Sequence, residues 1–254
     1  MTEVKEMVNA AAIAESAAQG KKYILTDETK TLKNGRVLHR IVAVKDVDDD
    51  VHKGDVGGWI EKEENLSHDD NCWVYGDACV FGDAKVFDKA TVCCNAWVYG
   101  NAKVFDNACV CGTALVFDDA NVFGKACVCE NAKVRGNAKI YGYAKVSGKA
   151  LVYGDAWVCD DANVYDNANV YDNAWVYGNT LVFDDAGVFG KACVRDNARV
   201  YGYAKIYGKA LIFDDANVFD DANVFGNANV GGNAKIYEKA LVCDNVLVYG
   251  DLTE

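Results

Sequence analysis

The chain has no proline, only two methionines and three histidines among its 254 residues. It also has no apolar run of about 18 residues, so a membrane-spanning helix is not expected. Residues 1–20 carry acidic side chains and lack the apolar core of a signal peptide. We therefore expect a cytoplasmic protein without a membrane partner.

Basic residues are scarce relative to acidic ones, and the formal net charge is −12. Both residues 1–72 and the remainder are mildly acidic, so neither part offers a basic stripe that would neutralise phosphates. No nucleic-acid partner is expected. Lysines such as Lys89 and Lys125 are interleaved with aspartates, which argues against the dense single-sign field of an acidic DNA mimic.

After residue 72 the composition is dominated by Val, Ala, Asn, Asp, Gly, Tyr and Phe. From Trp73 the chain divides into units of six, which begin WVYGDA, CVFGDA and KVFDKA. Thirty such units follow one another without insertion or deletion and end at Leu252. This bias, in a chain that is half hydrophobic, indicates a structural repeat and not a disordered segment.

Two columns of the repeat predict the interior. The second place of each unit is Val or Ile from Val74 to Val248, and the sixth is Ala except at Thr180, Val246 and Leu252. Alternate residues of a strand face opposite sides, and the intervening places carry many charges, so Val and Ala must face inward. The two remaining places hold Gly, Asp, Asn or Lys, which suit turns.

A short strand followed by a corner at period six closes a triangular coil after every third unit. The sequence therefore predicts an all-β fold, a single-stranded parallel β-helix of about ten 18-residue coils and roughly 48 Å long. We assign 72–254 to this helix. Residues 21–71, with a turn near Asn34, are expected to form a small β capping module, and the alanine-rich residues 1–20 an N-terminal helix.

The pairs Val74 with Ala78 and Ile140 with Ala144 show the pattern, an aliphatic residue followed four places later by a small one. In this the array resembles the hexapeptide-repeat superfamily, which implies a left-handed β-helix. More narrowly, the segment 53–67, KGDVGGWIEKEENLS, resembles uncharacterised phage- and prophage-encoded members. The resemblance covers the fold well, whereas function transfers poorly between proteins of one fold.

The acyltransferases of that superfamily use a histidine base and usually a loop extruded from a coil, and its carbonic anhydrases use three histidines on zinc. The array contains no histidine, because His39, His52 and His68 all precede it. No unit carries an extruded loop. We therefore predict that the chain is not an enzyme and has no catalytic residues and no cofactor. A degenerate acyltransferase relative is kept as an alternative.

Aromatic residues dominate the outside. Of the thirty places that follow the core Val or Ile, twenty-one hold Tyr or Phe, and an 18-residue spacing stacks them into ladders. Such ladders stabilise neighbouring coils, and they also offer flat apolar surface to a partner. The residues that we predict for interaction are Trp97, Tyr99, Tyr153, Trp157, Tyr171, Trp175, Phe189 and Tyr207, together with Val246 and Leu252 of the last coil.

The eleven cysteines all lie between Cys72 and Cys243, at repeat places shared with other residue types, so we expect free thiols. The residues Cys109, Cys111, Cys127 and Cys129 form a patch on one face. Alternate residues of one strand are about 6.6 Å apart, which is wide for a thiolate cage. We therefore predict no metal and interpret the patch as packing, with a metal site as the alternative.

Three functions remain open. The leading hypothesis is a β-helical scaffold or protein-interaction module that forms a homo-oligomer, a dimer or trimer, through aromatic faces or its C-terminal end. The second is a phage-encoded inhibitor that binds a host defence protein. The third places a ligand or catalytic site in the capping module, where the side chains would have to converge; its candidate residues are Arg36, His39, Arg40, His52 and Asp55.

Overall fold

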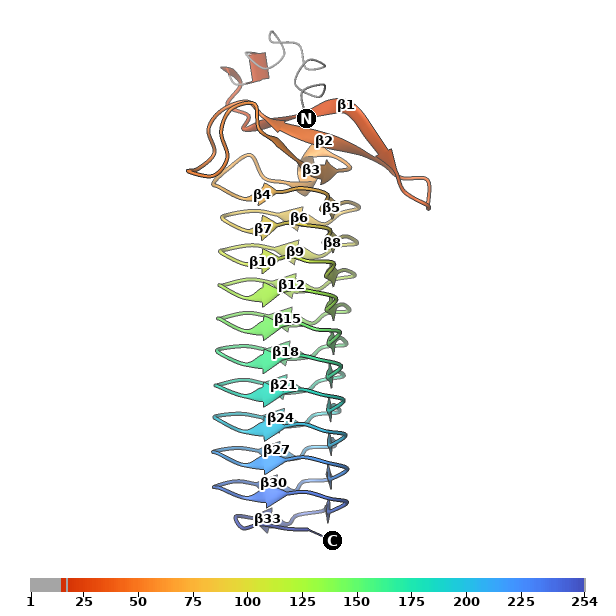
Figure 1. The fold of residues 1–254 in the computed structure, drawn as a ribbon, viewed down its shortest axis with the longest axis vertical. Coiled ribbons are helices and arrows are strands. Elements are labelled where there is room, and N and C mark those ends of the chain that lie inside the picture. The colour runs from red at the N-terminus through yellow and green to blue at the C-terminus, as the bar shows by residue number, and fades with distance from the viewer. Residues whose placement is uncertain (1–14, 17, 254) are drawn as a thin grey trace.

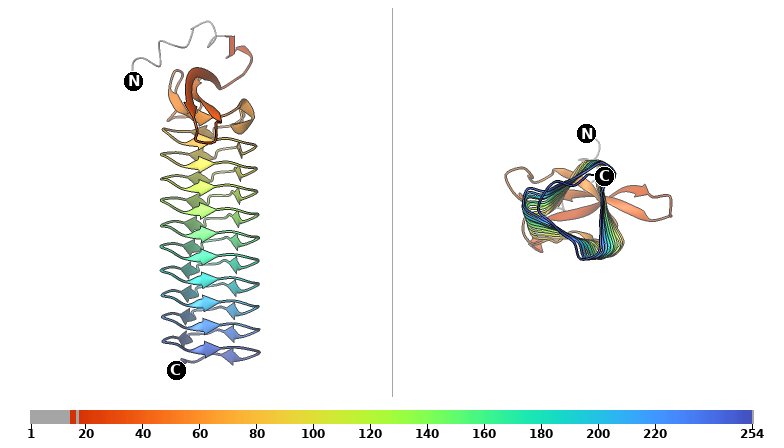
Figure 2. Two further views of the ribbon diagram at one scale, coloured as in Figure 1. Left: turned by 90° about the vertical axis from the view of Figure 1, so that its right-hand side faces the viewer. Right: turned by 90° about the horizontal axis from the view of Figure 1, so that it is seen from below.

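The computed structural model describes residues 15–16 and 18–253. It shows a long three-sided β-solenoid of about eleven turns with a small β module at one end (Figure 1). Seen along its axis, the solenoid is a triangular prism, and part of the module projects beyond its outline (Figure 2). The solenoid is left-handed, as the resemblance implied. Within the described ranges, no helix is long and apolar enough to cross a membrane.

The module consists of three strands. Strands β1 (Tyr23–Thr31) and β2 (Val37–Ala43) form an antiparallel hairpin, and β3 (Val56–Ile60) pairs antiparallel with β2. The hairpin turns at Gly35, whose φ of 83° suits a residue without a side chain. This confirms the predicted hairpin and its turn.

The turn that precedes the repeat array was not predicted. Strand β3 also pairs in parallel with β5 (Cys79–Val80), with Trp59 opposite Cys79, and Leu66 forms a parallel bridge with Val86. Segment 53–67 therefore builds one further turn below the module, which includes the 3-10 helix η1 (Glu63–Asn65). With this turn, the solenoid has about eleven turns and not the ten that were predicted. The turn was missed because more residues separate Trp59 from its partner Cys79 than the 18 of a regular coil.

Three parallel sheets form the sides of the prism. The first face continues from β3 through β5, β8 (Trp97–Val98), β11 (Leu115–Val116), β14 (Lys133–Val134), β17 (Leu151–Val152), β20 (Asn169–Val170), β23 (Gly187–Val188), β26 (Lys205–Ile206), β29 (Asn223–Val224) and β32 (Leu241–Val242).

The second face comprises β4 (Trp73–Val74), β7 (Thr91–Val92), β10 (Cys109–Val110), β13 (Cys127–Val128), β16 (Lys145–Val146), β19 (Asn163–Val164), β22 (Leu181–Val182), β25 (Arg199–Val200), β28 (Asn217–Val218) and β31 (Lys235–Ile236).

The third face comprises β6 (Lys85–Val86), β9 (Lys103–Val104), β12 (Asn121–Val122), β15 (Lys139–Ile140), β18 (Trp157–Val158), β21 (Trp175–Val176), β24 (Cys193–Val194), β27 (Leu211–Ile212), β30 (Asn229–Val230) and β33 (Leu247–Val248).

The interior is the predicted one. The Val, Ile and Ala columns are almost completely buried from Val74 to Val242. In the outward column before the core Val or Ile, Lys103, Lys133 and Lys145 are exposed, and most other residues are half-buried. Consecutive coils stay in register, so that Val110 lies beside Val128, and Cys109 donates its backbone N–H to the Ala126 carbonyl at 2.9 Å. Thr180 takes an alanine place and satisfies its buried hydroxyl by donating it to the Tyr177 carbonyl.

The corners depend on left-handed backbone, which costs energy in any residue with a side chain. Gly100 has φ +72°, and a Cβ there would lie 2.9 Å from the Asp118 nitrogen of the next coil. Where aspartate takes this place, its carboxylate offsets the cost: Asp106 (φ 56°) accepts the backbone N–H of Gly124 at 3.0 Å. Each acidic corner of this kind therefore ties its own coil to the next one.

The structure bears differently on the predictions for the two ends of the chain. Most of the predicted helix of residues 1–20 lies outside the described residues, so it stays a prediction. In the last described coil, Val246 and Leu252 are 47 % and 37 % exposed. They occupy the place that alanine fills elsewhere, but they are not enclosed as the alanines are.

We expect Val110→Ala to lower the free energy of unfolding by roughly 1 to 3 kcal/mol, because it opens a cavity in a fully buried column. The exposed Lys103→Ala should change it by less than about 0.5 kcal/mol. Urea denaturation followed by circular dichroism measures both changes. Equal effects of the two substitutions would contradict the assignment of inside and outside.

Candidate functional site

The first face carries a nearly continuous aromatic ladder. Phe81, Tyr99 and Phe117 stack with ring centroids 5.0 and 4.9 Å apart, and their planes lie within 4° of parallel. Further along, rings 4.8 to 5.0 Å apart stack in the order Tyr153, Tyr171, Phe189, Tyr207, Phe225. The Arg135 guanidinium lies over Tyr153, 4.7 Å from its centroid, at the beginning of this second run.

The other two faces carry ladders of their own. On the second face stacked rings follow one another in the order Tyr165, Phe183, Tyr201, Phe219, Tyr237. On the third face they follow in the order Phe87, Phe105, Phe123, Tyr141. The ladder geometry predicted from the 18-residue spacing is thus confirmed.

The predicted interaction residues do not form one site. The first face holds six of them, namely Trp97, Tyr99, Tyr153, Tyr171, Phe189 and Tyr207. Trp157 and Trp175 belong to the third face, where their rings stack at 4.8 Å and Trp175 is 46 % exposed. The structure therefore groups them by face, and it separates all of them from Leu252, which is bridged to Ile236 on the second face.

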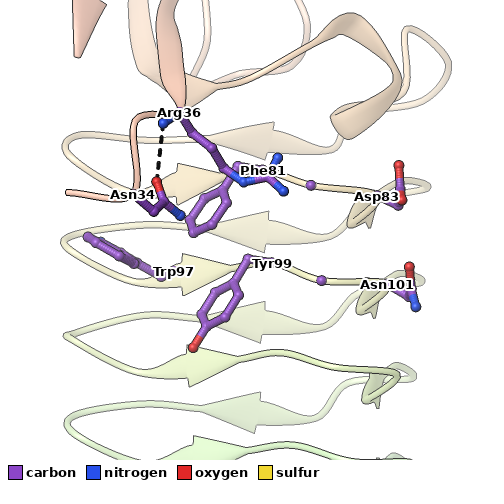
Figure 3. A pocket seen from close by; sticks show the side chains of 9 residues that line it. Asn34, Arg36, Phe81, Asp83, Trp97, Tyr99 and Asn101 are labelled. Atoms are coloured by element: carbon purple, nitrogen blue, oxygen red, sulfur yellow. Dashed lines mark hydrogen bonds between the residues drawn. The ribbon is translucent and has the colours of Figure 1, made fainter. Parts of the chain in front are cut away.

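A recess lies where the β1–β2 hairpin hangs beside the first coils. It has a volume of about 450 Å³, and Figure 3 shows Phe81, Trp97 and Tyr99 on the prism side with Asn34 and Arg36 from the hairpin. Arg36 also donates to both Glu61 carboxylate oxygens at 2.8 Å. The predicted residues Trp97 and Tyr99 therefore share a concave site with two hairpin residues. The sequence does not predict this site, because the repeat says nothing about how the hairpin is oriented relative to the prism.

The other side chains considered in the module are engaged separately. His39 contacts the Thr26 carbonyl through Nδ1 at 3.1 Å, and the Arg40 guanidinium packs on Trp59 with its carbon 4.0 Å from the centroid. His52 lies 3.8 Å from the Asp55 carboxylate near the surface. These contacts hold three different parts of the module in place, and they do not bring Arg36, His39 and His52 together around a common ligand.

A buried amine joins the module to the prism. Lys22 is 1 % exposed, and its Nζ donates to the Cys72 carbonyl at 2.8 Å and contacts the Cys72 Sγ at 3.0 Å. Nζ also donates to the carbonyls of Asp69 and Asp70. Burial lowers the pKa of Lys22 and raises the pKa of Cys72. The pair closes the top of the solenoid, and sequence reasoning missed it because neither residue is part of a motif.

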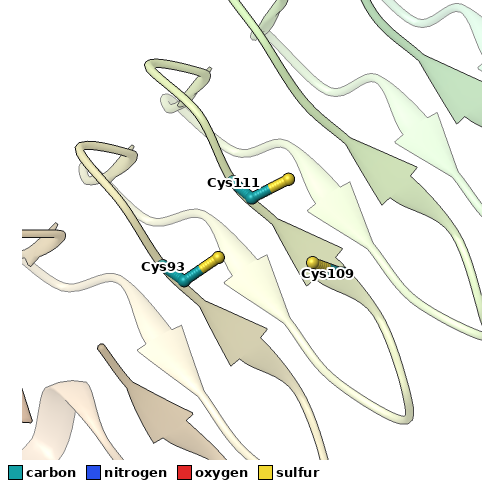
Figure 4. A group of neighbouring side chains, drawn as sticks. All are labelled: Cys93, Cys109 and Cys111. Atoms are coloured by element: carbon teal, nitrogen blue, oxygen red, sulfur yellow. The ribbon is translucent and has the colours of Figure 1, made fainter. Parts of the chain in front are cut away.

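Five cysteines gather on the second face. The Sγ atoms of Cys93, Cys109 and Cys111 all lie within 4.8 Å of one another, as do those of Cys111, Cys127 and Cys129 (Figure 4 shows the first group). All eleven cysteines of the chain are free thiols. Although alternate residues of a strand are about 6.6 Å apart along the backbone, these side chains lean together.

The pKa values of these thiols are shifted in different directions. A hydrogen bond from Cys109, helped by other thiols and by the positive charge of Lys145, lowers the pKa of Cys127 to about 6, although burial opposes the shift. Burial raises the pKa values of Cys93 and Cys129 to about 12 each. The pKa of Cys109 is raised, first by its hydrogen bond to Cys127. Cys127 is therefore the most acidic of these thiols.

Comparison with known proteins gives one informative relative. No protein-family model matches the chain. An uncharacterised acetyltransferase, YdcK of Escherichia coli (strain K12), is 35% identical over 74 residues, which amount to 26% of this chain and 22% of that protein. The chain thus matches about a fifth of the length of this relative. Together with the β-solenoid, the similarity fits the hexapeptide-repeat superfamily.

This similarity overturns the expectation that the chain is not an enzyme, because the relative carries the name of an acetyltransferase. The expectation rested on the absence of histidine from 72–254 and of a loop extruded from a coil. These absences were too weak a ground, since carboxylates and thiols lie on the outside of the prism and further polar residues lie in the module.

We expect Cys127 to be the most reactive thiol of the chain. Because its pKa is lowered, the thiolate exists above about pH 6, and the rate of alkylation by iodoacetamide should rise as the pH increases through that value. Cys193, whose pKa is raised by burial, should react several-fold more slowly at pH 7. Peptide mass spectrometry after timed alkylation measures both rates; equal rates at pH 7 would refute the shift.

Proposed function

We propose that this β-helix is a rigid scaffold that associates with a second copy of itself through the aromatic ladder of the first face. The observation that carries the proposal is the run of five stacked rings from Tyr153 to Phe225. Because each ring is fixed by its neighbours, the strip loses little conformational entropy when a partner covers it.

The surroundings of the strip favour docking. These rings are half-buried, so one side of each remains accessible. Gly187 stands beside Phe189 in the neighbouring column and has no side chain to cover that ring, since a Cβ there would be 3.8 Å from it. Corner residues of both signs, such as Lys191 and Asp172, border the strip. A rim of mixed charge is compatible with its own copy in a two-fold arrangement.

The partner is a second copy for a physical reason and by resemblance. A flat ladder with an 18-residue repeat is complementary to an identical ladder placed against it, because the ring spacing of 4.8 to 5.0 Å is the same on both sides. The resembled superfamily also commonly forms trimers. We place this assembly in the cytoplasm. A host protein, as in the phage-inhibitor hypothesis, is the competing occupant.

Tyr171→Lys should disperse the oligomer and leave the fold intact, because it puts a charge in the middle of the strip at the loss of about 1 to 2 kcal/mol of ring stacking. Light scattering at low and high salt measures the mass against the 27.6 kDa chain. Tyr201→Lys makes the same change in the ladder of the second face and should keep the oligomer. A wild-type monomer, or equal dispersal by both variants, would contradict the proposal.

A second function, acyl transfer, is favoured by the similarity to the named acetyltransferase. The recess beside Trp97 is the place that we propose for a thioester arm, since its wall is aromatic and Arg36, whose Nη1 is held by Glu61, has further N–H donors for a carrier phosphate. Asp83 lines the same recess, but its hydrogen bond from Lys62 lowers the pKa of the carboxyl. It would therefore be a weak general base, and positioning of the carrier would be the main contribution of this site.

If the recess binds an acyl carrier, Arg36→Ala should weaken acetyl-CoA binding about tenfold or more, because a charge-assisted hydrogen bond contributes roughly 1.5 to 3 kcal/mol. Isothermal titration calorimetry measures the affinity, and radiolabelled acetyl-CoA reports transfer. Arg199→Ala removes an arginine from the far part of the second face and serves as the matched control. Absence of binding by the wild type would exclude this second function.

A further inference from the structure

The cysteine group interrupts a regular pattern. On the second face the ladder column holds Cys93, Cys111 and Cys129 in succession, where rings would continue the stack. At comparable heights the other two faces keep their rings, for example Tyr99 with Phe117 and Phe105 with Phe123. The neighbouring column of the second face also holds two cysteines, Cys109 and Cys127, which lie directly opposite each other. If cysteine only filled gaps in the aromatic ladder, it would not also have to occupy the neighbouring column.

The backbone holds these thiols in fixed positions. They lie on or directly after three successive strands, β7, β10 and β13, whose register is set by the parallel pairs 91 with 109 and 109 with 127. Cys93 and Cys129 extend the group to either side of β10. The result is two groups of three sulfurs that share Cys111, each with all its sulfurs within 4.8 Å of one another.

That spacing suits a metal ion. With a metal–sulfur bond of about 2.3 Å, three thiolates around one ion lie about 4 Å from one another. The observed limit of 4.8 Å is therefore closed by small rotations about Cα–Cβ bonds, without any change in the backbone. Carboxylates do not enter either group, so the donor set is purely sulfur and selects soft ions.

We propose that Cys93, Cys109, Cys111, Cys127 and Cys129 form a thiolate site for two Cu(I) ions, with Cys111 bridging them. Each group of three sulfurs supplies a trigonal set, which Cu(I) accepts. Structural zinc is almost always four-coordinate, and an iron–sulfur cluster requires four cysteines per cluster, so neither group satisfies them. Packing, which the sequence favoured for this patch, explains neither the shared sulfur nor the two groups of three.

The binding step exchanges protons for metal. Each thiol that ligates loses its proton to solvent, the two electrons of the new bond come from sulfur, and copper stays in the +1 state throughout. Lys145, next to Cys127 on β16, partly compensates the negative charge that results. The positive charge of the bound ion stabilises the thiolate form of each sulfur that ligates it.

Access and burial are also appropriate. Cys93, Cys109, Cys111 and Cys127 are half-buried, and Cys129 is buried. Sulfurs at such positions are reachable by an ion delivered from solution.

The chain contains its own control. Segment 123–128, FGKACV, recurs at 189–194, so Cys193 is the counterpart of Cys127. The two segments are eleven units apart, which is not a whole number of coils. Cys193 therefore lies on the third face, on strand β24, where its neighbours across the strands are Trp175 and Leu211. It has the same local sequence and strand position as Cys127 without the neighbouring sulfurs.

The test is an anaerobic titration of the reduced full chain with Cu(I), supplied as its bicinchoninate complex. We expect two ions per wild-type chain, one for Cys109→Ser or Cys129→Ser, and at least about a tenfold loss of affinity for both ions in Cys111→Ser. Cys193→Ser should keep both ions. Circular dichroism checks that each variant is folded, which serine should allow because all of these side chains lie outside the Val and Ala core.

A second readout is thermal stability, because an ion that joins β7, β10 and β13 binds only the folded chain. Cu(I) should raise the melting temperature of the wild type and of Cys193→Ser, and much less that of Cys111→Ser. Equal loss of copper in Cys111→Ser and Cys193→Ser would overturn the proposal. So would tighter binding of Zn(II) than of Cu(I), or a stoichiometry unchanged when all five cysteines are replaced by serine.

Discussion

The packing of Val or Ile against Ala inside each three-unit coil is the constraint on which the rest of the structure depends. The interior of the prism admits these side chains and little more, so each coil has the same width and the next coil repeats its path. In-register strands follow, as with Val110 beside Val128. Because the coils repeat so closely, outward side chains of successive coils lie directly above one another. Aromatic rings therefore stack on rings, and cysteines lie beside cysteines.

This constraint explains which features were predictable. A strict period of six identifies the fold, the inward columns, the ladders and the positive-φ corners, since each is a local consequence of the repeat. The turn around Trp59 was missed because its pairing with Cys79 is out of step with that period, and because Gly58 stands two residues before Ile60 where the array has Ala. The recess beside Trp97 and the contact of Lys22 with Cys72 join segments without periodic relation, and no spacing predicts them.

The candidate sites differ in the same way. The sequence identified the patch of Cys109 and its neighbours, because stacking follows from the period, but it did not predict how closely the sulfurs approach. Side-chain rotation decides that distance, and backbone spacing sets only its upper range. The prediction about catalysis failed for another reason: it used the absence of histidine, and a relative named as an acetyltransferase shares part of the sequence.

Duplication by units of six has a consequence for surface chemistry. A copied segment lands on the face fixed by its distance along the chain, so the counterparts Cys127 and Cys193 have different neighbours. New combinations of side chains therefore arise between strands and not within the copied segment. In such a fold, a binding site on the surface is formed by side chains from neighbouring coils that are stacked on one another.

The coils are stacked along the axis of the prism (Figure 1), and the hydrogen bonds between them include those that corner carboxylates accept, such as Asp106 from the backbone N–H of Gly124. A pulling force applied between the two ends therefore loads these bonds in series, and every coil interface carries the full tension. The weakest interface therefore breaks first, and the molecule lengthens by the chain of one released coil at a time. Because the coils have equal length, extension by force should proceed in steps of about equal size.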